Sequence, residues 1–77
     1  MRWEAHISVD PNVCHGKACI TRTRVLVSVV LDNLAGGESA DSIAEAYHIT
    51  ADDVRAALLY AAALSKERIV PLKTSTA

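Results

Sequence analysis

Residues 14–24, CHGKACITRTR, bring together side chains that could bind a metal ion, a phosphate or an acidic partner. This segment and the residues before it include four residues of the types that bind zinc: His6, Cys14, His15 and Cys19. The spacing argues against zinc, because a C-x4-C pair without a second pair of ligands is a weak pattern. Small cysteines beside apolar residues are more commonly part of a core. We therefore expect no metal site.

The Gly16-Lys17 pair could belong to a phosphate-binding loop. That loop needs an earlier glycine and a hydroxyl residue directly after the lysine, whereas Ala18 follows Lys17. Nucleophilic catalysis by Cys14 would need a base that a third group orients, and the adjacent His15 on a loop does not provide this geometry. We expect no enzymatic activity, no cofactor and no small-molecule substrate.

The remaining chemistry of the segment lies in three cations within eight residues: Lys17, Arg22 and Arg24. A guanidinium stays charged and bonds two oxygens at once, so these side chains suit contacts with DNA phosphates or with the carboxylates of a protein partner. A solvated basic turn without a ligand is the alternative.

Length and composition limit the elements that position these residues. A chain of 77 residues has room for one domain with a modest core, yet 51% of its residues are apolar. This excess predicts self-association or a permanent partner. The net charge of -1 provides no general attraction to nucleic acid, so any DNA contact must be local. We find no apolar run long enough for a membrane span and no signal-peptide pattern, and therefore expect a cytoplasmic protein.

The N-terminal part is predicted to be extended. Residues 5–9, AHISV, alternate apolar and polar side chains and are followed by Asp10-Pro11-Asn12, which is typical of a strand and a turn. A loop then leads to a second short extended piece at residues 18–20.

Three helices follow. From about Val25 the apolar residues recur with helical spacing up to Gly36-Gly37, and Ser39 can cap a second helix. Thr50 and Asp53 form a capping-box pattern that opens a third helix through roughly Lys66. The short connection between the last two helices is characteristic of a helix-turn-helix, although an αα-hairpin of another purpose has the same spacing.

The third helix is predicted to have two apolar faces. One must pack on the first two helices and consists of Val54, Ala57, Leu58 and Ala61. The other would be exposed in a monomer, and we expect it to form a homodimer interface through Ala56, Leu59, Tyr60 and Ala63. The alternative is a helix of small residues with a few scattered apolar side chains.

Residues 67–77 follow this single domain of residues 1–66 as a tail. The tail opens with ERIVPL, a strand-like apolar segment that could add to a sheet edge of a second copy or of another protein. Fraying of this segment in the isolated chain is the alternative.

The order and spacing of several short motifs resemble a small bacterial and archaeal family, the domain of unknown function number four hundred and thirty-three, which is usually regarded as VapB-like antitoxins. The matching pieces extend over about residues 5 to 63 and are Ile7 to Pro11, Gly16-Lys17, Ile20, Thr23-Arg24-Val25, Val27, Gly37, Tyr47, Thr50, Asp53-Val54 and Tyr60-Ala61. The sequence differs from the family pattern at Ala18, Arg22 and Leu26, where the family prefers proline, glycine and proline.

The resemblance implies a mainly α, three-helix domain of homeodomain-like or winged helix-turn-helix type with a short N-terminal β element. It also implies an antitoxin that inhibits a PIN-like ribonuclease toxin and binds operator DNA to repress its own operon. An arginine would then lie against the acidic cleft of the toxin, where it would exclude metal and substrate phosphate. Arg68 is the first candidate, and the toxin-binding segment would contain Arg68, Ile69, Val70 and Leu72.

The start of the third helix argues against simple reading of DNA bases. Asp52 and Asp53 lie at the end that would enter a major groove, and Arg55 is the only nearby cation. We therefore expect DNA to contact mainly the basic loop, with Lys17, Arg22, Arg24 and Arg55 as candidate residues. The alternatives are a DNA-binding transcriptional regulator that acts alone and an interaction domain with another partner.

Overall fold

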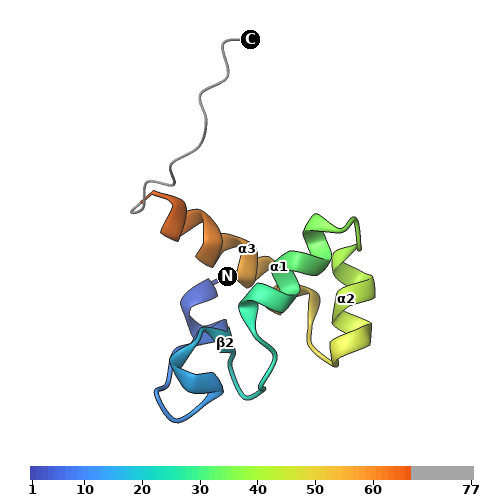
Figure 1. The fold of residues 1–77 in the computed structure, drawn as a ribbon. Helices are drawn as coiled ribbons and strands as arrows, with labels where there is room; N and C mark the ends of the chain where they lie inside the picture. The colour runs from blue at the N-terminus through green and yellow to red at the C-terminus, as the bar shows by residue number, and fades with distance from the viewer. Residues whose placement is uncertain (67–77) are drawn as a thin grey trace.

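The computed structural model describes residues 1–66, and the predicted toxin-binding residues Arg68, Ile69, Val70 and Leu72 lie outside this range. The described chain consists of three α-helices and a short two-stranded sheet near the N-terminus, as the sequence predicts (Figure 1). None of the helices within residues 1–66 has the length and apolar character that crossing a bilayer requires.

The N-terminal part begins with a 3-10 helix, η1 (Trp3–His6), followed by strand β1 (Ile7–Ser8). A second 3-10 helix, η2 (Cys14–Gly16), leads to strand β2 (Cys19–Ile20). The strands are antiparallel, with Ile7 opposite Ile20 and Ser8 opposite Cys19. The predicted strand at residues 5–9 is therefore confirmed only for residues 7–8, because the preceding residues turn to pack against the third helix.

The second and third helices begin at the predicted caps, whereas the first helix begins at Val27, two residues after the predicted start of about Val25. Helix α1 (Val27–Ala35) ends before Gly36-Gly37, and Gly37 has a φ of 97° that favours glycine. Helix α2 (Ala40–Tyr47) begins after Ser39, whose hydroxyl accepts a hydrogen bond from the Ser42 N–H at 3.1 Å.

Helix α3 (Ala51–Ser65) begins with the predicted capping box. Thr50 Oγ1 accepts a hydrogen bond from the Asp53 N–H at 3.0 Å, and Asp53 Oδ2 accepts one from the Thr50 N–H at 3.0 Å. Residues 48–50 connect α2 to α3, and His48 adopts the left-handed conformation with a φ of 57°. The two helices and this connection form the expected helix-turn-helix topology.

The core lies where the sheet and the three helices meet. Its buried members come from every one of these elements and from the α2–α3 turn: Ile20, Val27, Val30, Ile43, Ile49, Val54 and Ala57. Ile20 is completely buried although it belongs to a two-residue strand. The N-terminal part is therefore integral to the hydrophobic core of the helical domain.

The prediction for the two apolar faces of α3 is wrong at two positions. Leu58, expected to face the other helices, is 48% exposed, whereas Ala56, expected at a dimer interface, is completely buried. Ala56 is buried because η1 packs along α3. Trp3 meets Tyr60 edge to face with ring centroids 6.0 Å apart, and His6 Nδ1 lies 2.7 Å from Asp53 Oδ1.

Asp53, Ala56 and Tyr60 recur at helical spacing, so the chain's own N-terminal segment covers the stripe that contains Ala56 and Tyr60. Leu59 and Ala63, the other two residues of the predicted interface, are half-buried. The apolar side chains that were expected to be covered by a second copy are thus partly buried within one chain.

Candidate functional site

The basic loop, residues 21–26, connects β2 to α1 and is shaped by a network around Thr23. The Thr23 hydroxyl donates to the Ile20 carbonyl at 2.7 Å and accepts from the Val25 N–H at 3.0 Å. The Thr23 N–H also donates to the Ile20 carbonyl at 3.0 Å, and the Ile20 N–H donates to the Val25 carbonyl at 2.9 Å. These bonds close a tight loop that presents Arg22 and Arg24 on either side of Thr23.

Arg22 has a left-handed backbone conformation, with a φ of 67°. A residue with a Cβ is disfavoured in this region by roughly 1–2 kcal/mol, whereas glycine is not. This conformation explains why the family that the sequence resembles prefers glycine at the position. In this chain the loop carries an additional cation at the expense of backbone strain.

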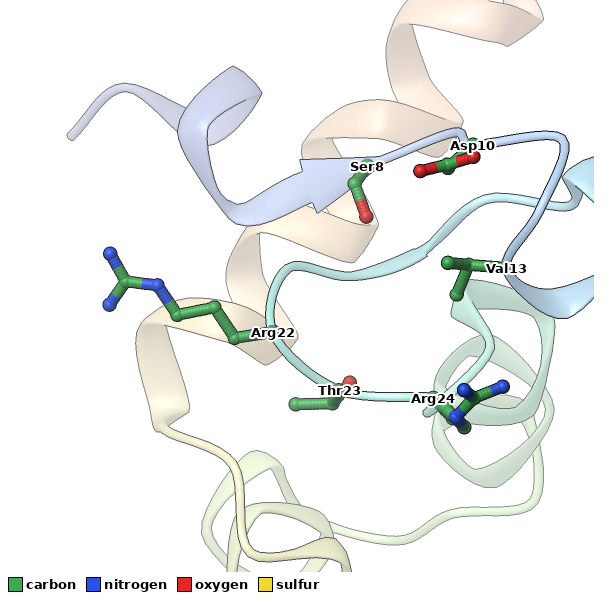
Figure 2. Close-up of a pocket in the computed structure, with 6 residues that line it drawn as sticks. All are labelled: Ser8, Asp10, Val13, Arg22, Thr23 and Arg24. Carbon is green, nitrogen blue, oxygen red and sulfur yellow. The ribbon is translucent and has the colours of Figure 1, made fainter.

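An open depression of about 620 Å³ lies beside the basic loop and is lined by Ser8, Asp10, Val13, Arg22, Thr23 and Arg24 (Figure 2). Figure 2 shows Arg22 and Arg24 extending in different directions from either side of Thr23, with Ser8 across from them on β1. Neither arginine forms a salt bridge within residues 1–66. Two arginines therefore border the depression, and their guanidinium groups point away from each other.

The other two predicted DNA-binding cations lie elsewhere. Lys17 lines a different depression, of about 530 Å³, together with Val27 and Leu31 of α1 and Tyr60 and Leu64 of α3. Arg55 lies on the exposed side of α3. The structure thus brings Arg22 and Arg24 to one depression and leaves Lys17 and Arg55 outside it.

The two cysteines form hydrogen bonds with backbone carbonyls of the basic loop. Cys14 Sγ donates to the Arg24 carbonyl and Cys19 Sγ donates to the Thr23 carbonyl, each at 3.6 Å. Desolvation, a hydrogen bond with Cys19 and the nearby charge of that thiol raise the pKa of Cys14 above 9.0, against a lowering effect of Arg24. A protonated thiol is a poor nucleophile and a poor metal ligand, so the raised pKa favours a packing role for Cys14. Cys19 is buried, which favours a packing role for that residue as well.

Within residues 1–66, no three histidine, cysteine or acidic side chains are grouped closely enough to hold a metal ion. The residue types that suggested zinc are distributed over separate environments. Cys19 is buried beside Ser8, whereas His6 contacts the start of α3. The geometry of the described residues therefore offers no metal centre around Cys14 and Cys19.

No pattern in the sequence indicated the pair formed by His6 and Asp53. Burial raises the pKa of Asp53, but hydrogen bonds from the Thr50 backbone, from His6 and from the Thr50 side chain, together with the His6 charge, lower it below its ordinary value. Asp53 Oδ1 contacts His6 and Asp53 Oδ2 accepts from Thr50, so both oxygens are engaged. This pair joins η1 to the start of α3.

A third depression, of about 420 Å³, contains this pair and is lined by Ala5, His6, Thr21, Arg22, Thr50 and Asp53. Arg22 borders this depression as well as the one beside Arg24. The loop arginine therefore lies between the candidate anion site and the contact that holds η1 on α3.

A family model described as "Protein of unknown function (DUF433)" matches residues 7–61, from β1 to the middle of α3. The chain belongs to the DUF433 family. The match includes both strands, the basic loop, α1, α2 and most of α3. The part of the chain that matches the DUF433 model therefore contains the candidate site.

The DUF433 fold also occurs in a crystal structure of a DUF433 member protein from Anabaena variabilis. The two chains are 28% identical and superpose with a TM-score of 0.73 over 83% of this chain and 64% of that chain. The match therefore spans less than two thirds of the length of the structural neighbour. A comparison with curated proteins found no match.

Proposed function

We propose that this DUF433 protein is a cytoplasmic antitoxin that binds and inhibits a PIN-like ribonuclease toxin and catalyses no reaction itself. The observation that supports the proposal is the pair Arg22 and Arg24, which border one open depression and form no salt bridge within residues 1–66. Residues held in strained backbone conformations cluster at binding and switch sites, so the left-handed conformation of Arg22 favours a loop that meets an anionic partner. An acidic protein surface would supply that partner.

The chemistry of a metal-dependent ribonuclease cleft fits these two arginines. Such a cleft holds a divalent cation with clustered carboxylates and brings a phosphate oxygen to the metal. A guanidinium donates two parallel hydrogen bonds to one carboxylate, so it competes with the metal for the same oxygens. Arg22 and Arg24 would therefore act beside Arg68, the candidate in the tail, by neutralising the cleft.

The proposal is tested with the product of the reading frame next to that of this chain, which the proposal expects to be a PIN-like nuclease. Its ribonuclease activity in Mg²⁺ is measured with increasing amounts of the full chain, of Arg22→Glu/Arg24→Glu and of Arg68→Glu. We expect the chain to inhibit and the double variant to need at least tenfold more protein for the same inhibition. Arg2→Glu is the matched control, because it reverses an exposed charge away from the loop.

Equal inhibition by all four proteins would contradict a role for these arginines. Failure of the full chain to inhibit the neighbouring nuclease, or to rescue growth on co-expression, would contradict the antitoxin proposal itself.

A DNA-binding role is the second candidate, favoured by the helix-turn-helix topology and by the same two arginines. The start of α3 is ill suited to the major groove, because Asp52 is exposed there and Asp53 is engaged by Thr50 and His6. Phosphate contacts would instead come from the basic loop. In a mobility-shift titration with upstream DNA, replacing both arginines by alanine would reduce the salt slope by about 1 for each lost phosphate contact.

A further inference from the structure

One side of α3 faces solvent along its whole length. This outer face consists of six exposed residues at helical spacing, with Leu59 and Ala63 half-buried at its border: Ala51, Asp52, Arg55, Leu58, Ala62 and Lys66. Leu58 is 48% exposed and is the only large apolar side chain exposed on an α-helix within residues 1–66. The other two sides of α3 are covered by η1 and by α1 with α2.

The order of residues along the outer face is self-complementary. Leu58 is the central residue of α3, which spans Ala51–Ser65. The negative charge of Asp52 lies at the N-terminal end of the face, and the positive charge of Lys66 lies directly after its C-terminal end. A helix with this arrangement fits a second copy of itself that runs in the opposite direction.

We infer that two copies of this chain pair through the outer faces of their α3 helices, which lie antiparallel with the two-fold axis between Leu58 and Leu59. In this register Leu58 of one copy lies opposite Leu59 of the other, and Lys66 of each copy lies opposite Ala51 of the other, next to Asp52. Arg55 faces Ala62, so the two Arg55 side chains lie about 10 Å apart along the helix axis.

The chemistry of the individual positions favours this pairing. The small side chains of Ala51 and Ala62 let two helices approach closely, and the central leucines remove apolar surface from water. The aliphatic part of Arg55 can cover Ala62 while its guanidinium remains in water. Antiparallel helices also place each positive N-terminus beside a negative C-terminus.

Asp52 is available for this role because the cap of α3 does not use it. Asp53 supplies the capping carboxylate and contacts His6, whereas Asp52 is exposed and forms no salt bridge within residues 1–66. The pairing is independent of the antitoxin proposal, since it involves neither Arg22 nor Arg24. It moves the predicted dimer interface from Ala56 and Tyr60 to Leu58 and its neighbours.

The first test measures the dimer dissociation constant of the full chain by sedimentation over a concentration series. We expect a monomer–dimer equilibrium for the chain and at least a tenfold higher dissociation constant for Leu58→Asp. Val9→Asp is the matched control, because Val9 is 60% exposed outside the helices and should leave the equilibrium unchanged. A chain that stays monomeric at every concentration, or a Leu58→Asp variant that dimerises normally, would overturn the inference.

The second test reverses the charges. Asp52→Lys and Lys66→Asp should each weaken the dimer about two- to fivefold for each exposed pair that they break. Combined in one chain, the two substitutions restore both intermolecular pairs, so the double variant should dimerise nearly as well as the original. Circular dichroism monitors helix content, because both substitutions oppose the α3 dipole.

A double variant weaker than both single variants would overturn the antiparallel register. The outer face could also bind the nuclease. That outcome is recognised by a monomeric chain in which Leu58→Asp removes toxin inhibition, and it would likewise overturn the pairing of two copies.

Discussion

The helical part of the molecule, residues 27–65, and the N-terminal part, residues 1–26, are stabilised by different kinds of contact. The helices begin at local caps such as Ser39 and the Thr50–Asp53 box, whose partners lie three residues apart. The N-terminal part has two-residue strands and depends on contacts with distant residues, including Trp3 with Tyr60 and His6 with Asp53. The N-terminal part, which has little regular structure, contains the candidate site and also contributes Ile20 to the core of the helical part.

The largest expected effect comes from removing the contribution of the N-terminal part to the core. Ile20→Ala should lower the free energy of unfolding by about 3 kcal/mol, because Ile20 is completely buried among residues of the three helices. Urea denaturation followed by circular dichroism measures the change. Ile20→Val, which keeps most of the volume, should lower it by only about 1 kcal/mol. An unchanged helical transition in Ile20→Ala would show that the two parts are energetically separate.

The second change affects Asp53, which caps α3 and also contacts His6 of the N-terminal part. Asp53→Ala removes the capping carboxylate and the contact with His6, so we expect a loss of about 2 kcal/mol. His6→Ala removes only the long-range contact and should lower stability by about 1 kcal/mol. Chemical denaturation of both single variants and the double variant gives the coupling energy. Additive effects would contradict a direct interaction between His6 and Asp53.

The third change relieves strain in the basic loop. Arg22→Gly should raise the free energy of unfolding by about 1 kcal/mol, because Arg22 has a φ of 67° that glycine adopts without a Cβ penalty. Arg22→Ala is the matched control, since it removes the same charge and keeps the Cβ. Thermal unfolding of both variants distinguishes the two effects. Equal stability of the glycine and alanine variants would exclude backbone strain at this position.

The smallest expected effect is a pH dependence that arises from Asp53. Its pKa is lower in the folded chain than the ordinary value of 3.8, so its stabilising contribution is complete above that value. The contribution is lost as the pH falls through the lower folded-state pKa. Asp53→Asn should make the free energy of unfolding less dependent on pH below 3.8 when both proteins are followed by urea denaturation. Parallel curves for the two proteins would contradict this assignment.

The difference between the two parts also explains which features the sequence could predict. Ser39, Thr50 and Asp53 define helix starts through bonds to residues three positions away, so local patterns sufficed. The packing of η1 on α3 joins residues 47 positions apart in the case of His6 and Asp53, and no local pattern encodes it. That packing is why Ala56 is buried and why the predicted dimer stripe was misplaced.

The residue types of the candidate site could be predicted from the sequence, but the arrangement of these residues in space could not. Clustered cations in residues 17–24 indicated a basic loop. The hydrogen bonds of the Thr23 hydroxyl shape this loop so that Arg22 and Arg24 share a depression and Lys17 does not. The left-handed conformation of Arg22 had one signal, the glycine that the family prefers there. Reading that preference as a backbone requirement would have predicted a strained arginine.

The edge-to-face contact between Trp3 and Tyr60 allows the packing of the N-terminus on α3 to be followed in solution. Trp3 is the only tryptophan of the chain, so intrinsic fluorescence at the indole wavelength reports solely on this ring and its surroundings. A stopped-flow refolding trace recorded by emission would time the arrival of the N-terminus on α3, while far-ultraviolet ellipticity would time the helices. No dye or engineered label is needed to follow the two processes separately.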